Sequence, residues 1–214
     1  MKTIVAVIVY NRFNNVEEWI RRWKMCHKEG ADFILIHNYD TEEHIEPFRT
    51  LCSVNNVGYV PRRNVGMDIG AFQDVCRGRL EGFPNEWDYL FWCADDTLPM
   101  SKKFLTYYLR VMGKGSGVVC LEVSNEVKTH IRTTGFLIDQ HTASLINFPA
   151  DPISTKNHCY EFEHRSKDAF YEQVVRLKKS VIQVHPDLKK SYLWDTHCRA
   201  NLRRRNEYHI EFPR

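Results

Sequence analysis

The sequence lacks most features of extracellular, membrane and zinc-binding proteins. No Cys-x-x-Cys pair occurs, and no apolar run approaches the roughly 18 residues of a membrane span. The apolar segment Ile4 to Tyr10 is short and is followed at once by polar residues, so it is predicted to be a strand and not a signal peptide. Seven widely spaced cysteines favour reduced thiols. We therefore expect a soluble, cytoplasmic protein.

The net charge is small and repetition is absent. The chain has 30 Lys+Arg against 27 Asp+Glu, and a net charge of +3 is too small to indicate nucleic-acid binding by itself. Basic residues do gather near the end, at Arg199, Arg203, Arg204 and Arg205, which leaves a local anionic contact open. No internal repeat or low-complexity linker divides the 214 residues. A single domain over residues 1–214 is therefore expected.

Apolar runs alternate with amphipathic segments along the chain. Residues 3–10, 32–37 and 54–60 are predicted to be strands, with intervening helices capped by Asn14 or Asn15 and by Thr41. This order implies right-handed crossovers and a parallel sheet. Further helices are expected from Ser101, over 140–147 and from Ser166, and further strands over 117–123, 131–138 and 181–184. The pattern predicts an α/β fold with a mixed, mostly parallel sheet flanked by helices.

The segment from Trp87 to Met100 organises the rest of the prediction. Its apolar run, long enough for a buried strand, ends at two adjacent carboxylates, Asp95 and Asp96, followed by Thr97. Open α/β sheets bind their ligands at this end of the strands. Neighbouring carboxylates repel each other, and a shared hard cation stabilises them. The alternative is an ordinary Asp-Asp-Thr turn.

A second polar segment precedes a helix at residues 64–72. Asn64, Gly66 and Asp68 are expected at the amino end of that helix, where backbone amides favour phosphate or ribose oxygens. The alternative is that Asp68 only caps the helix and Gly66 only turns the chain.

The predicted strands of this chain end at Tyr10-Asn11, near Asp40 and at the Asp95-Asp96 pair. These strand ends resemble the nucleotide-sugar half of GT-A glycosyltransferases such as family 2. More specifically, five segments resemble the rhamnan synthesis F family: Asn64-x-Gly66-x-Asp68-Ile69-Gly70-x-Phe72, Asp95-Asp96-Thr97, and the segments 124–130, 159–164 and 194–197. The resemblance spans most of the chain. It implies a Rossmann-like, GT-A-like domain with a nucleotide-sugar half at 1–100, an acceptor side at 101–198 and a basic tail at 199–214.

The resemblance also implies an activity. A sugar would move from a UDP-, GDP- or dTDP-sugar to the hydroxyl of a glycan, of another polymer or of a nucleic-acid base. Mn²⁺ or Mg²⁺ would stabilise the charge on the departing diphosphate. The family's acidic motif is Asp-x-Asp, and Cys93 stands at its first position. Because a buried thiol is a poor partner for a hard ion, Asp95 would bind the metal, with Asp96 binding directly or through water.

The remaining ligand and base are expected later in the chain. His197 is the first choice for a histidine ligand and His185 the second, and a histidine favours Mn²⁺. Glu163 is the candidate catalytic base, because its aromatic neighbours raise a carboxyl pKa. Asp96 is the second residue assigned a catalytic role. Glu126 is its rival.

Other residues are assigned to the donor. Asn11 and Asp40 are expected to contact the base and ribose, Arg63 or Arg62 the diphosphate, and His130 the donor sugar or the acceptor. A solvated arginine pair and a structural histidine are the alternatives.

Two other functions fit parts of the sequence. A sugar-phosphate nucleotidyltransferase shares the architecture, although the loop at residues 10–15 lacks the expected glycines. A non-catalytic sugar- or nucleic-acid-binding module would account for Cys93 and the basic tail.

Overall fold

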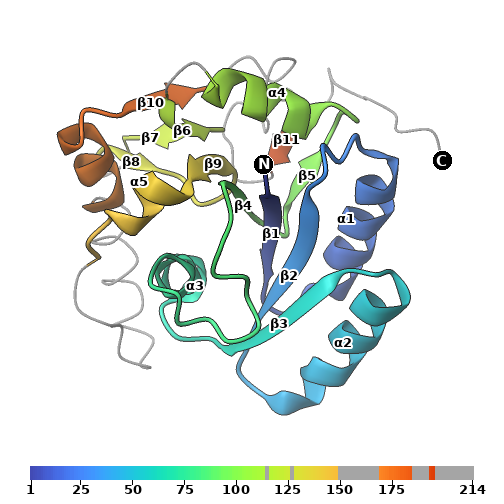
Figure 1. Cartoon of the computed structure of the whole chain (residues 1–214). Helices are drawn as coiled ribbons and strands as arrows, with labels where there is room; N and C mark the ends of the chain where they lie inside the picture. Colours follow the sequence, from blue (N-terminus) through green and yellow to red (C-terminus); the bar gives the residue numbers. More distant parts are fainter. Residues whose placement is uncertain (114–115, 126–127, 149–168, 185–192, 196–214) are drawn as a thin grey trace.

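The computed structural model describes residues 1–113, 116–125, 128–148, 169–184 and 193–195. At its centre is a seven-stranded sheet in the order β10-β6-β9-β4-β1-β2-β3 (Figure 1). Its strands are β1 (Thr3–Val9), β2 (Asp32–Tyr39), β3 (Gly58–Arg63), β4 (Tyr89–Ala94), β6 (Ser116–Cys120), β9 (Phe136–Asp139) and β10 (Ser180–Gln183). β9 is antiparallel to both of its neighbours, and the other pairs are parallel. The prediction of a mixed, mostly parallel α/β fold is confirmed.

Helices cover both faces of this sheet (Figure 1). One face packs against α1 (Phe13–Met25), α2 (Ile45–Val54) and α4 (Phe104–Met112). The other packs against α3 (Met67–Cys76), α5 (Gln140–Ser144) and a helical segment at residues 169–176. In β1, Val5, Val7 and Val9 join the first core, and the residues between them join the second. Burial on both faces explains why the strand is apolar at every position.

The predicted helix caps are wrong in detail. α1 begins at Phe13 after Arg12, so Asn14 and Asn15 lie inside its first turn. Thr41 precedes the 3-10 helix η1 (Glu42–His44), but its side chain makes no capping hydrogen bond to that helix. Ser101 accepts a hydrogen bond from the backbone N of Lys103 at 3.1 Å, one turn ahead of α4. Asn15 and Thr41 use their side chains for other contacts, with Asp95 and Glu43.

The later half departs most from the predicted elements. The predicted strand 131–138 is two strands: β9, and β8 (His130–Ile131), which pairs with β7 (Val123–Ser124) outside the main sheet. β5 (Thr97–Pro99) and β11 (Leu193–Asp195) form another antiparallel pair that local sequence patterns did not reveal. Within the described residues, no helix has the length and apolar character needed to cross a membrane.

Candidate functional site

The candidate site lies at the carboxyl ends of β1 to β4. β1 pairs with β2 on one side and with β4 on the other, and the helices that follow β1 and β3 lie on opposite faces. The chain order therefore reverses between β1 and β4, which is where open α/β sheets bind ligands. Asp95 and Asp96 follow β4 at this point, and the backbone N of Asp95 donates to the carbonyl O of Ile8 at 2.9 Å. The predicted position of the carboxylate pair at a strand end is confirmed.

Asp95 and Asp96 are both buried, with 7% of each residue exposed. Asn15 Nδ2 donates to Asp95 Oδ2 at 2.9 Å. Arg12 Nη1 lies 3.0 Å from Asp96 Oδ2 and 3.8 Å from Asp95 Oδ1. Desolvation, followed by the neighbouring charge of Asp96, raises the pKa of Asp95 to about 6. Two adjacent buried carboxylates that share one arginine are hard oxygen donors and fit a divalent cation.

Arg12 and Asn15 were missed in the sequence analysis. They lie three residues apart, Arg12 directly before α1 and Asn15 in its first turn, and both side chains reach the carboxylate pair. That spacing was the available signal, but Asn15 also satisfied the pattern of a helix cap.

Cys93 lies below the site, in the core. The residue is 0% exposed, and its Sγ lies 3.9 Å from the carbonyl O of Ala6. Burial raises the pKa of this thiol well above its ordinary value, so the thiol stays protonated. The expectation of a buried thiol at this position is confirmed, and the side chain contributes no metal ligand.

The loop before α3 is tightly built. Gly66 and Met67 both have left-handed backbone angles, with φ of 75° and 57°. This conformation is costly for Met67, and Asn38 Nδ2 supports it with a hydrogen bond to the Met67 carbonyl O at 3.0 Å. A Cβ at Gly70 would lie 2.3 Å from the carbonyl O of Val65. The glycines therefore let the loop pack closely against the first turn of α3.

Asp68, in that first turn, is already bonded. Its Oδ1 accepts from the backbone N of Ile69 at 2.8 Å, and its Oδ2 accepts from the hydroxyl of Thr133. Thr133 belongs to the later half of the chain, so this contact joins the two halves at the amino end of α3. The assignment of Asn64, Gly66 and Asp68 to the donor stays a prediction.

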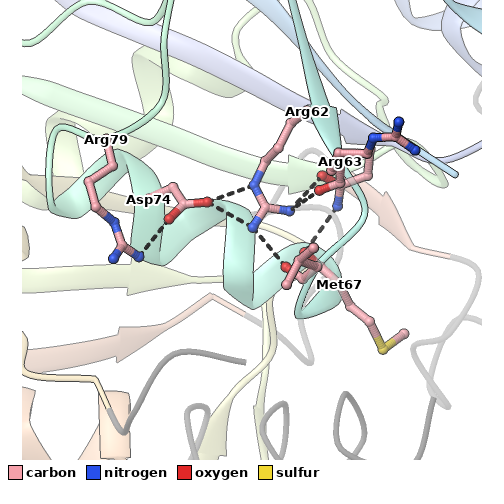
Figure 2. A network of polar contacts seen from close by, with 7 residues as sticks. Arg62, Arg63, Met67, Asp74 and Arg79 are labelled. Atoms are coloured by element: carbon pink, nitrogen blue, oxygen red, sulfur yellow. Dashed lines mark hydrogen bonds and ion pairs between the residues drawn. The ribbon is translucent and has the colours of Figure 1, made fainter. Parts of the chain in front are cut away.

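Arg62 holds this loop from the side of β3 (Figure 2). Its Nε donates to Asp74 Oδ2 at 2.8 Å, and its Nη2 donates to the Val65 carbonyl O at 2.7 Å. Its Nη1 donates to Asn38 Oδ1 at 3.0 Å, and Arg79 completes the cluster with a 2.7 Å bond to Asp74. The Arg62 side chain is 9% exposed, so it is a structural clamp.

Arg63, by contrast, faces outward. Its side chain is 62% exposed, and its Nη1 donates to the Asp40 carbonyl O at 3.1 Å. The Asp40 carboxylate accepts from the Tyr10 hydroxyl. Asn11 is exposed directly beyond the β1 end. Of the two arginines considered for the diphosphate, Arg63 is therefore the accessible one, on the same edge as Asp40 and Asn11.

The other predicted residues are less closely tied to this edge. His130 is half-buried on β8, with its Nδ1 2.9 Å from the Lys128 carbonyl O. Glu163, His197, Glu126 and His185 lie outside the described residues. The described residues contain no cluster of three His, Cys, Asp or Glu side chains suited to a metal.

β11 pairs with β5, directly after the carboxylate pair. Asp195 is the register partner of Thr97, which directly follows the carboxylate pair. His197 comes two residues after Asp195 in the sequence. The strand that leads to the predicted histidine ligand thus runs beside the segment that carries Asp95 and Asp96.

Several solved glycosyltransferases are similar in structure. The mannosyltransferase PcManGT from Pyrobaculum calidifontis, solved with GDP-Man and Mn²⁺, matches 87% of this chain with a TM-score of 0.62 at 12% identity. TarS residues 1–349 from S. aureus match 78% of the chain, with a TM-score of 0.50 at 12% identity. Glucosyl-3-phosphoglycerate synthase from Mycobacterium tuberculosis, solved with phosphoglyceric acid, matches 85%, with a TM-score of 0.50 at 8% identity. The chain therefore has the GT-A-like fold of these enzymes.

The likeness is limited to the fold. The chain spans 55% of the length of PcManGT and of TarS 1–349, and 68% of the synthase. No protein-family model matches the sequence, and neither does any curated protein. Membership of the rhamnan synthesis F family stays a prediction.

Proposed function

We propose that this chain is a metal-dependent glycosyltransferase domain that moves a sugar from a nucleoside-diphosphate sugar to an acceptor hydroxyl. The observation that carries the proposal is the buried Asp95 and Asp96 pair at the reversal point of the sheet. The same fold holds GDP-Man and Mn²⁺ in PcManGT.

Asp95 and Asp96 would hold the divalent ion, and His197 would complete its ligands, with His185 as the alternative. The ion, Mn²⁺ or Mg²⁺, would stabilise the negative charge on the leaving diphosphate. Support for His197 comes from the pairing of Asp195 with Thr97. We assign the histidine to Mn²⁺ because imidazole favours it over Mg²⁺.

The donor would lie along the edge formed by the ends of β1, β2 and β3. Asp40 would accept a hydrogen bond from a ribose hydroxyl or a base imide, and Asn11 would bind the base. The exposed guanidinium of Arg63 would bind phosphate oxygens, because a planar fork of donors suits them. Asn64, Gly66 and Asp68 would place backbone amides at the amino end of α3 against the donor.

The acceptor side is assigned from the later half. Glu163 would take the proton of the acceptor hydroxyl, with Glu126 as the alternative, and His130 would contact the donor sugar or the acceptor. The acceptor would be a glycan or another hydroxyl-bearing polymer, and Arg199 and its basic neighbours would suit a nucleic acid.

Turnover of nucleotide sugars by an Asp95→Ala variant tests the proposal. A panel of UDP-, GDP- and dTDP-sugars is first screened by thermal shift with and without Mn²⁺, because a ligand at about a hundred times its Kd adds roughly 2.7 kcal/mol of stability. Asp95→Ala should then abolish Mn²⁺-dependent product formation, whereas Asp32→Ala, at the exposed start of β2, should retain it. Full activity of Asp95→Ala would remove the metal from the proposal. A donor that binds without turnover would indicate the non-catalytic alternative.

A further inference from the structure

Arg12 contacts both carboxylates that the proposed function assigns to the divalent ion. Its Nη1 is 3.0 Å from Asp96 Oδ2 and 3.8 Å from Asp95 Oδ1. Asn15 donates to the other oxygen of Asp95 at 2.9 Å. Three of the four carboxylate oxygens of the pair therefore already lie within 3.8 Å of Arg12, which directly precedes α1, or of Asn15 in its first turn.

A divalent ion and this guanidinium compete for these oxygens. An ion needs the carboxylate lone pairs that now face Arg12, and two positive charges a few ångströms apart repel each other. The ion must therefore either displace Arg12 or bind more weakly because of it.

The Arg12 side chain is exposed enough to be displaced. Its side chain is 55% exposed, whereas the Asp95 and Asp96 side chains are 9% and 7% exposed. Arg62 provides the contrast, because its side chain is 9% exposed and donates to Asp74, Asn38 and Val65 at once. The half-exposed Arg12 side chain can change its rotamer without breaking a buried hydrogen-bond network, whereas the Arg62 side chain cannot.

We infer that Arg12 is an internal counter-cation: it offsets part of the negative charge of the Asp95 and Asp96 pair in the ion-free protein, and it leaves the pair when a divalent ion binds. This inference rests on the proposed function only in placing the ion at these two carboxylates. Arg12 thus lowers the ion affinity of the site while reducing the buried negative charge that the ion-free protein must hold.

The test is direct Mn²⁺ binding to the whole chain without any nucleotide, followed by the electron paramagnetic resonance signal of free aqueous Mn²⁺. Arg12→Gln removes the charge but keeps a polar side chain, and it should lower the Kd for Mn²⁺ about tenfold, the effect of two partly exposed ion pairs. Arg12→Met is also neutral and should give the same tightening. Arg12→Lys retains the charge and should bind Mn²⁺ like the unmodified protein.

Arg49→Gln is the matched control. Arg49 has the same 55% exposure as Arg12 and also pairs with a carboxylate, Glu46, at 2.9 Å, but it lies on α2. Its Kd for Mn²⁺ should be unchanged. An equal change in Arg49→Gln would mean that general surface charge sets the affinity, and would overturn the inference.

The remaining outcomes separate this inference from the proposed function. Equal Kd values for the unmodified protein and Arg12→Gln overturn the counter-cation and leave the glycosyltransferase proposal standing. Tighter Mn²⁺ binding by Arg12→Gln without turnover of any nucleotide sugar supports the counter-cation and overturns the proposed function. Absence of Mn²⁺ binding by either protein overturns the counter-cation.

Discussion

Replacing Asp95 with Asn should stabilise the ion-free protein. The pKa of Asp95 is raised from 3.8 to about 6 in the folded chain. A group whose folded pKa lies above its unfolded value contributes stability that is fully present below pH 3.8 and is lost as the pH rises through about 6. The shift of about two units corresponds to about 3 kcal/mol of lost stability at neutral pH. Asn models the uncharged carboxyl and can still accept the hydrogen bond from Asn15.

The assay is urea unfolding of both proteins between pH 3.5 and 8 in the presence of a chelator. At pH 8 the variant should be more stable by about 3 kcal/mol, or by roughly 6 to 12 °C in Tm for a chain of this length. The difference should shrink toward zero as the pH falls through the window from about 6 to 3.8. His37 titrates in an overlapping range, but it is present in both proteins and cancels in the comparison.

Added Mn²⁺ should reverse the ranking, because only the unmodified protein retains both carboxylates. A variant that is no more stable at pH 8, or whose advantage persists unchanged at pH 3.5, would refute the account of Asp95 as a buried charge kept for ion binding.

Two further predictions concern the packing beside the site. Gly70→Ala should lower the free energy of unfolding by about 1 to 3 kcal/mol and weaken donor binding, because the added Cβ would lie 2.3 Å from the Val65 carbonyl O. The measurement is thermal unfolding, and the control is Gly113→Ala, whose added Cβ would have no contact closer than 3.5 Å. Burial lowers the pKa of His37 to about 4, so the contribution of the neutral imidazole to stability should be fully present above about pH 6.5 and should be lost as the pH drops toward 4. In urea titrations, His37→Gln should lose this part of the pH dependence. Unchanged slopes in His37→Gln, or an unaffected Gly70→Ala, would contradict these accounts.

The sequence predicts β1 and β4 well because each is a continuous apolar run, whereas the strand predicted over 54–60 is wrong in its bounds, since Val54 ends α2 and β3 is the half-polar segment Gly58–Arg63. β1 and β4 are covered on both faces, so their apolar residues occur without interruption and their ends are sharp. A sharp end locates Asp95 and Asp96 at the edge of the sheet. Parallel pairing then brings Asn11 and Asp40 to the same edge.

The parts that escaped prediction depend on contacts between distant segments. β5 pairs with β11 across nearly the whole second half of the chain, and neither strand has a strong local pattern. Asn15 satisfies the local pattern of a helix cap, yet it donates to Asp95, some eighty residues away. No local rule distinguishes these uses, because the same side-chain amide serves both.

Cys93 stands at the first position of the expected Asp-x-Asp motif, and the alternation of side chains along β4 explains this departure. Phe91 and Cys93 both point into the core that α1, α2 and α4 cover, where Phe91 packs against Phe104 and Tyr108 of α4, whereas Trp92 points to the opposite core. A carboxylate at position 93 would face Ala6 inside the sheet, and it would not face the ion. Cys93→Asp should therefore fail to tighten Mn²⁺ binding and should lower the free energy of unfolding by several kcal/mol, since a buried charge would have no partner. A stable Cys93→Asp variant with a lower Kd for Mn²⁺ would mean that the side chain at position 93 reaches the ion. That result would contradict the packing described above, in which only residues after the end of β4 face the ion.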